Sequence, residues 1–248
     1  MRHSLIILIA AAFFTGCITV KNNQLVTNSA NNNTIVGGKL FTAVWQQRAA
    51  EYKALCEQAY NIATLRVQQY YNADTSSKAK AIVTDIDETF LNNAPYAVHQ
   101  ALQGKDFSSA SWSEWTSRAD ADTLAGALAF FKFAASKGMT IFYVTNRNEA
   151  DRQGTLKNLQ KFGFPNADNE HLWLMDKTSS KEERRQKIAK DYDIVLLLGD
   201  NLGDFSALFD KKSEAERSEN VLNNKRRIRA AFHRSSESEL RRLGRCDV

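Results

Sequence analysis

The chain has 248 residues, 43% of them hydrophobic and 25% charged, and this composition excludes wholesale disorder. A chain of this length suits one α/β domain with a small elaboration. The net charge is +5, and residues 225–248 alone contribute +5, from eight Lys/Arg against three Asp/Glu. Because the rest of the chain balances to zero, its body lacks the positive field that attracts a polyanion, and we expect no nucleic-acid partner.

Residues 1–16 have the pattern of a secretory signal. Met1-Arg2-His3 gives a basic start, and an apolar run from Leu5 to Phe14 precedes Thr15-Gly16-Cys17. Such a run is too short to span a bilayer permanently. The cysteine directly after Thr-Gly resembles a bacterial lipoprotein signal, which implies lipidation of Cys17 and an anchor in the cell envelope, expected at the outer membrane. A plain signal peptide with an incidental cysteine is the alternative.

The next elements are a tether and then long helices. Residues 17–38 are polar and rich in asparagine, so we expect a flexible tether. From Phe41 to Ala73, apolar residues recur at helical spacing without Gly or Pro, which predicts one or two long helices. Short apolar segments then alternate with helical ones. The pattern predicts strands at 79–84, 139–145, 171–175 and 194–198, and helices at 123–136, 149–162 and 181–190. The last of these helices is entered at Ser180 with Glu183 at the spacing of a capping box.

Strands rich in Val, Ile and Leu that are separated by helices are typical of a parallel sheet covered on both faces, a Rossmann-like α/β fold. In such sheets ligands bind beyond the carboxyl ends of the strands. Polar segments follow three of the predicted strands, and a lysine opens the helix before the last one. They are Asp85-Ile86-Asp87-Glu88-Thr89, Thr145-Asn146-Arg147, Gly199-Asp200-Asn201-Leu202-Gly203-Asp204 and Lys181. We expect them to meet at one edge of the sheet.

Taken singly, these segments have ordinary structural explanations. An Asp after a strand often caps a turn or helix, a Thr can simply end a strand, and a lysine in a first helical turn is usually solvated. Together, in this order, they resemble the four-part signature of the haloacid-dehalogenase-like hydrolases. The resemblance implies that fold, with a small, mainly helical cap at about 90–121 inside a phosphatase domain at 39–212. It also implies Asp85 as nucleophile and Asp87 as general acid and base. Dehalogenase and ion-pump relatives lack the second Asp, so its presence favours a phosphatase.

The same resemblance implies a bound Mg²⁺, an ion that takes oxygen ligands and offsets the repulsion between carboxylates and a phosphate. The implied ligands are the carboxylates of Asp85 and Asp200 and the backbone carbonyl of Asp87. Asp204 is implied to orient metal-bound water. The implied phosphate-binding residues are Thr145, Asn146 and Lys181, of which the lysine also restrains the nucleophile.

Longer matches narrow the resemblance to the class C acid phosphatases, the lipoprotein-e family. The matching segments are Glu51 to Leu55, Asp85 to Tyr96, Phe142 to Arg147 and Gly199 to Phe205. The family implies nonspecific hydrolysis of phosphate monoesters, with a preference for 5′-nucleotides such as nicotinamide mononucleotide. It also implies aromatic contacts to the base, for which Tyr96 and Trp112 are candidates, since stacking is worth ~1–3 kcal/mol per base. Alternatively, Trp112 and Trp115 fasten the cap to the core.

The C-terminal region departs from that family. Residues 213–248 form a basic tail with no strand-like run, where the family has a further strand, and we interpret this as a diverged or frame-shifted end. Two other functions stay open: a non-catalytic surface-binding lipoprotein on this scaffold, and a phosphotransferase of the same fold. The sequence also leaves open the redox states of Cys56 and Cys246. It does not determine the oligomeric state, for which a dimer is one option.

Overall fold

The computed structural model describes residues 24–73 and 77–225. At its centre lies a four-stranded parallel sheet in the order β5-β4-β1-β6. The strands are β1 (Lys80–Thr84), β4 (Thr140–Val144), β5 (Leu172–Trp173) and β6 (Asp193–Leu198). The predicted parallel sheet is confirmed, although β5 is shorter than the strand expected at 171–175.

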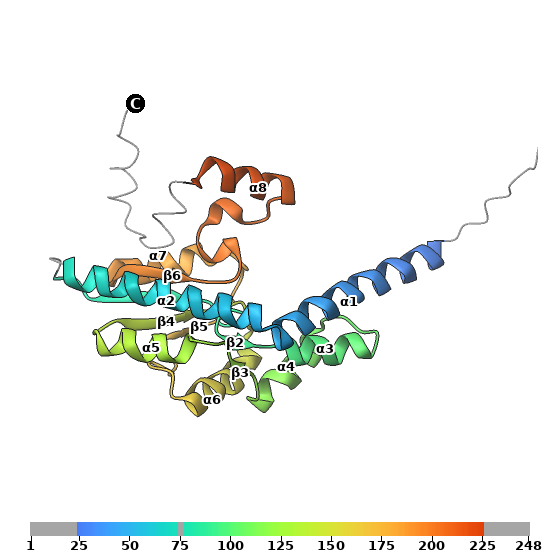
Figure 1. Ribbon diagram of the computed structural model, residues 1–248, viewed down its shortest axis with the longest axis horizontal. Helices are drawn as coiled ribbons and strands as arrows, with labels where there is room; N and C mark the ends of the chain where they lie inside the picture. The colour runs from blue at the N-terminus through green and yellow to red at the C-terminus, as the bar shows by residue number, and fades with distance from the viewer. Residues whose placement is uncertain (1–23, 74–76, 226–248) are drawn as a thin grey trace, which may run out of the picture.

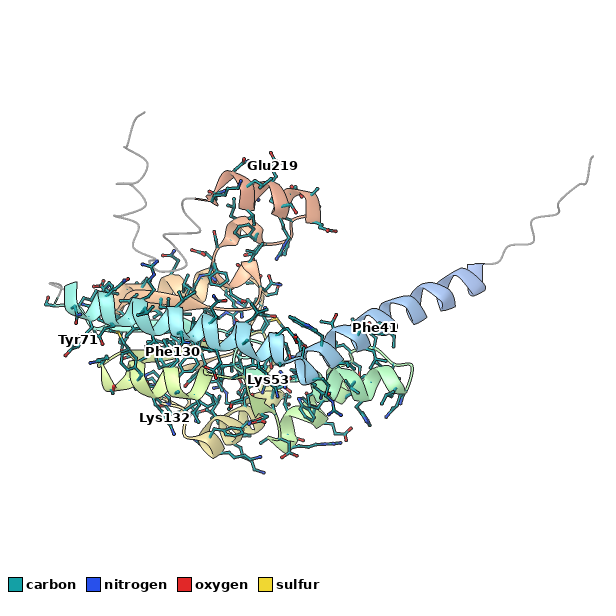
Figure 2. All side chains as sticks on the ribbon, viewed as in Figure 1. Phe41, Lys53, Tyr71, Phe130, Lys132 and Glu219 are labelled. Carbon is teal, nitrogen blue, oxygen red and sulfur yellow. The ribbon has the colours of Figure 1, made fainter. Side chains whose placement is uncertain are left out.

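Helices cover both faces of this sheet. Successive side chains of a strand point to opposite faces, so the apolar residues of each strand must be buried on both sides. Tyr143 of β4 packs into the larger apolar cluster, and its neighbour Phe142 packs into the smaller one on the other face. Three helices contribute to the larger cluster: α2 (Ala50–Ala73), α5 (Ala127–Ser136) and α6 (Arg152–Phe162). α7 (Glu182–Asp191) contributes to the smaller one. Figure 2 shows Phe130 of α5 near α2, where its ring centroid lies 5.6 Å from that of Tyr60.

Two long helices, α1 (Gln24–Arg48) and α2, precede the sheet and meet at Ala49, in agreement with the predicted pattern. α1 projects from the body of the protein (Figure 1), and Lys39 on it pairs with Asp106 beyond α3 (Ala94–Leu102). Residues 24–38 are thus helical, which corrects that part of the expected flexible tether. The later residues of α1 pack on α3, and the earlier ones project from the body (Figure 1). Residues 17–23 lie outside the described part of the chain.

No helix within residues 24–73 and 77–225 combines the length and apolar character that crossing a membrane requires.

A small cap is inserted between β1 and β4. It consists of α3 and α4 (Ser109–Arg118), and its base is an antiparallel ladder of β2 (Leu91–Asn92) with β3 (Asp122–Thr123). α4 begins where Ser108 Oγ accepts a hydrogen bond from the Ser111 backbone N–H, and it ends at Ala119 in a left-handed conformation. The predicted mainly helical cap is therefore present.

Asp151 fastens this cap to the core. It ends the short helix η1 (Glu149–Asp151), and its buried Oδ1 accepts hydrogen bonds from Ser113 and Thr116 of α4, each at 2.8 Å. Gly154 of α6 packs so closely on the Thr116 carbonyl that an added Cβ would lie 2.2 Å from its oxygen. These contacts fix the position of the cap against α6.

Between β6 and residue 225, where the description of the chain stops, there are three short helices: η2 (Leu202–Asp204), η3 (Ala207–Phe209) and α8 (Glu214–Asn223). The region expected to be an atypical tail from residue 213 thus begins as a helix, whose N-terminus carries a capping box of Ser213 with Glu216. Residues 226–248 lie outside the described part, as do Cys17 and Cys246. Cys56 is a free, half-buried thiol.

Candidate active site

Asp85 directly follows β1 and is held at three points. Its backbone N–H donates to the Leu198 carbonyl at 2.9 Å, which fixes it beside the end of β6. Lys181 Nζ lies 2.5 Å from Asp85 Oδ1, and Thr89 Oγ1 lies 3.4 Å from Oδ2. The carboxylate is 8% exposed, so it is buried but not sealed from a ligand. A fixed carboxylate at the end of a strand has the position that a nucleophile requires.

Asp200 and Asp204, which follow β6, complete a group of three carboxylates with Asp85. One oxygen from each lies within 4.8 Å of the others. Lys181 Nζ bridges two of them, since it also lies 2.6 Å from Asp204 Oδ1. Gly199 is required here, because an added Cβ would lie 2.3 Å from the Asp204 side chain. Hard carboxylate oxygens at this separation fit a divalent ion such as Mg²⁺.

Asp87, the predicted acid and base, faces a different partner. Arg147 Nε lies 3.1 Å from both of its carboxylate oxygens, and Nη2 lies 2.7 Å from Oδ1. Asn93 Nδ2 donates to the same oxygen at 2.8 Å. Arg147 is 3% exposed and is held in turn by Thr155 Oγ1 at 2.9 Å from Nη1. The carboxylate of Asp87 is thus oriented by a buried guanidinium, while only its backbone carbonyl was predicted to bind metal.

The turn after β4 carries the two residues predicted to bind phosphate. Thr145 is fully buried, and its Oγ1 accepts from the Arg147 backbone N–H at 3.2 Å. Asn146 is exposed, and its Oδ1 accepts from Arg184 Nη2 at 2.8 Å, which leaves the amide nitrogen of Asn146 available to a ligand. Arg184 Nη1 also donates to the Thr145 carbonyl at 2.6 Å. This turn therefore has a defined shape before any ligand binds.

The aromatic residues of the cap pack on one another and on the site. Tyr96 is buried, and its ring meets that of Trp112 edge-on with centroids 5.0 Å apart. Trp115 Nε1 donates to Asn93 Oδ1 at 2.8 Å, and the Arg147 guanidinium lies 5.6 Å from the centroid of Trp112. These contacts explain how the two tryptophans fasten the cap. Stacking of a substrate base on Tyr96 or Trp112 stays a prediction.

A groove of about 900 Å³ lies between α3 and α4, and its lining includes Tyr96 and Trp115. None of the three clustered carboxylates lines it. The chemistry is therefore placed at the sheet edge rather than in this groove.

Sequence reasoning assigned no role to Arg147, Asn93 or Arg184. Arg147 and Asn93 stand within the segments that resembled class C acid phosphatases, but local sequence does not indicate that they meet Asp87. Arg184 stands three positions after Lys181, so helical spacing places both on one face. The predicted capping box at Ser180 does not form. Ser180 Oγ donates instead to Asp210 Oδ2 at 2.5 Å, and Lys181 is the N-cap residue.

Burial and neighbouring negative charges raise the pKa values of several carboxyl groups in the site. Partial burial, and then the nearby Asp204, raise the pKa of Asp200 to about 6. Burial, and then Asp87, raise the pKa of Glu88 to about 8. Burial also raises the pKa of Asp85, against the opposing charge of Lys181. The metal-free protein therefore carries unfavourable negative charge at this site at neutral pH.

Stability of the metal-free protein should fall as the pH rises from about 5 to about 8. The folded-state pKa values of Asp200 and Glu88 exceed their ordinary values of 3.8 and 4.5, so in this range the folded state binds more protons than the unfolded state. Thermal unfolding in EDTA should show a decrease in Tm on the order of 5 °C across the range. Asp200→Asn should flatten the slope. A Tm that is constant or rises toward pH 8 would contradict the argument.

Comparison with known proteins gives the family. The family model of the HAD superfamily, subfamily IIIB (acid phosphatase), matches residues 17–231. This chain belongs to that subfamily. Two solved structures of a class C acid phosphatase from Bacillus anthracis, one of them with tungstate bound, superpose on the chain with a TM-score of 0.73 at 38% identity. Each alignment covers 77% of this chain and 80% of the other. The predicted haloacid-dehalogenase-like fold and the resemblance to class C acid phosphatases are both confirmed.

Two plant proteins are also similar to part of this chain. Acid phosphatase 1 of Solanum lycopersicum is 28% identical over 128 residues, which is 49% of this chain and 50% of the relative. The stem 31 kDa glycoprotein of Glycine max is 28% identical over 125 residues, 48% of this chain and 49% of the relative. The chain thus matches these curated relatives over about half of their length.

Proposed function

We propose that this subfamily IIIB protein is a Mg²⁺-dependent acid phosphatase that hydrolyses phosphate monoesters through an aspartyl-phosphate intermediate. One observation carries the proposal. Asp85, Asp200 and Asp204, from the ends of two neighbouring strands, bring carboxylate oxygens within 4.8 Å of one another beside the ammonium group of Lys181. Such a site offers both a nucleophilic oxygen and the countercharge that phosphoryl transfer requires.

The chain's residues divide the reaction between them. Asp85 forms a bond to phosphorus while the bond from phosphorus to the leaving oxygen breaks, and Asp87 gives that oxygen a proton. Asp87 then takes a proton from water as the water attacks phosphorus, which releases inorganic phosphate and regenerates the Asp85 carboxylate. Thr145 and Asn146 bind the phosphate oxygens. Lys181 restrains Asp85 and offsets the negative charge that develops in the transition state.

The metal fits the carboxylates present. Asp85, Asp200 and the backbone carbonyl of Asp87 would hold Mg²⁺, and Asp204 would act on its water ligands. Bound there, the ion would supply positive charge that lowers the repulsion between the phosphate and these carboxylates. As substrates we propose 5′-nucleotides such as nicotinamide mononucleotide. Support for this comes from the aromatic residues of the cap, with Trp112 beside the guanidinium that holds Asp87.

Removal of the metal should reduce turnover of p-nitrophenyl phosphate at mildly acidic pH to less than about one hundredth, because carboxylates without their cation repel the substrate. Rates would be measured before EDTA, after EDTA, and after Mg²⁺ is restored. Recovery with Mg²⁺ is expected. Full activity in EDTA would contradict metal dependence, and no activity in a folded protein under any condition would favour the non-catalytic lipoprotein. Adding an alcohol and comparing p-nitrophenol with inorganic phosphate would reveal a phosphotransferase.

We also propose that the protein is anchored at the outer membrane by lipid on Cys17. The support is the Thr15-Gly16-Cys17 signal, and several acyl chains on one residue give a stable anchor. Cells fed radiolabelled palmitate should label the wild-type protein and not the Cys17→Ser variant. Label retained by the variant would exclude this anchor.

A further inference from the structure

The first turn of α7 contacts every loop of the candidate site. Lys181, Arg184 and Arg185 stand at positions i, i+3 and i+4, so they share one face of the helix. Lys181 contacts Asp85 after β1 and Asp204 after β6. The two arginines bind backbone and side-chain oxygens in two different loops. α7 is therefore a common support for loops that are far apart in the chain.

Arg184 holds the turn after β4. Its Nη1 donates to the Thr145 carbonyl at 2.6 Å, and its Nη2 donates to Asn146 Oδ1 at 2.8 Å and to the Ser180 carbonyl at 3.2 Å. The planar fork of a guanidinium fits several acceptors at once, which a lysine ammonium on a flexible stem does not. Arg184 thereby fixes both the backbone of Thr145 and the orientation of the Asn146 amide.

Arg185 holds the loop after β6. It is 4% exposed, and its Nη1 donates to the Gly203 carbonyl at 3.0 Å and to the Asp204 carbonyl at 2.7 Å. Its Nη2 pairs with Glu182 Oε2 at 2.5 Å, which keeps the guanidinium in place. Burying a guanidinium without hydrogen-bond partners costs free energy of desolvation. The loop carbonyls and Glu182 supply these partners, so the position of Arg185 and the shape of the loop depend on each other. Asp204 is thus fixed through its backbone by Arg185 and through its carboxylate by Lys181.

We propose that Arg184 and Arg185 are positioning residues with separate tasks. Arg184 sets the affinity for the phosphate group by fixing the Thr145–Asn146 turn. Arg185 sets the affinity for the divalent ion by fixing the loop that carries Asp200 and Asp204. This inference rests on the proposed function of the same site. It extends that function by assigning the two binding steps to neighbouring residues of one helix.

The test compares Arg184→Lys with Arg185→Lys, since each substitution keeps the positive charge but loses the fork. Two equilibrium titrations are made on each protein: Mg²⁺ alone, and inorganic phosphate at saturating Mg²⁺. Arg184→Lys should weaken phosphate binding about tenfold and leave Mg²⁺ binding unchanged. Arg185→Lys should weaken Mg²⁺ binding about tenfold and leave phosphate binding unchanged once Mg²⁺ is saturating.

Lys187→Met provides the matched control on the same helix. Lys187 pairs with Glu183 at 2.8 Å on the exposed side, with side chains 54% and 70% exposed. Neither titration should change in this variant. The inference is overturned if both arginine variants weaken both ligands equally, if neither variant has an effect, or if the control changes as much as they do. Because both readouts are binding equilibria, they remain measurable without turnover, so failure of the proposed hydrolysis and failure of this inference give different results.

Discussion

Asp85→Asn should abolish hydrolysis of phosphate monoesters, with kcat reduced by at least about a thousandfold. The amide cannot form the bond to phosphorus that the carboxylate forms. The fold should survive, because Lys181 keeps Asp204 as a partner at 2.6 Å and burial already disfavours the charged form of Asp85. We therefore expect a Tm in EDTA no lower than that of the wild type.

A covalent intermediate separates this role from a structural one. Wild-type protein quenched with acid during turnover of a radiolabelled phosphate monoester should retain label, and Asp85→Asn should retain none. Asp120→Asn is a suitable control, because this carboxyl is 61% exposed and pairs with Lys161 away from the three clustered carboxylates. If the Asp85 variant turned over substrate at a rate near that of the wild type, the proposed nucleophile would be wrong.

Asp87→Asn should slow the hydrolysis of a 5′-nucleotide by about 10²–10⁴-fold, the usual contribution of a positioned acid and base. The alkoxide of a ribose leaves poorly unless it gains a proton. The p-nitrophenolate ion leaves well without one, so p-nitrophenyl phosphate should show a clearly smaller loss. Asparagine can still accept a hydrogen bond from Arg147, which limits changes to the surrounding contacts.

The ratio of the two substrates is the decisive measurement. A variant that merely disturbs the fold lowers both rates by one factor, since the same fraction of protein is lost to either substrate. The losses are compared as kcat/KM, which reports the steps up to departure of the leaving group and not the later attack of water that Asp87 also assists. Equal losses in kcat/KM for the nucleotide and the nitrophenyl ester would therefore exclude Asp87 as the proton donor. This comparison needs no estimate of how much protein is active, because both rates come from one preparation.

The orientation of Asp87 also connects the reaction to the cap. Arg147 contacts Asp87 on one side and lies 5.6 Å from the Trp112 ring on the other, and Asn93 bonds to both Asp87 and Trp115. Two short routes thus join the cap to Asp87, the proposed acid and base. Its aromatic residues have a structural task whether or not a base stacks on them.

The sequence by itself determined the parallel sheet and placed the loops of the candidate site at the carboxyl ends of its strands. Strands in a parallel sheet end at the same edge, so a carboxylate after 79–84 and two more after 194–198 were expected at one edge, and the pairing of β1 with β6 then brings them together. Local periodicity also predicted α2, the end of α1, and the shorter helices α5, α6 and α7. These features depend on near neighbours in the chain or on the geometry of regular elements, which a pattern of residue types specifies.

Only the tertiary structure decided the contacts that orient those loops. Asp87 and Arg147 are 60 positions apart, and Asn146 and Arg184 are 38 apart, so no local pattern relates them. The pairing of Ser180 with Asp210 also depends on a distant partner, and there the local capping-box signal gave the wrong answer. The helix at residues 24–38 was likewise not indicated by the local pattern. A hydrogen bond depends on distance and direction within a few tenths of an ångström, and these are fixed by how the elements pack.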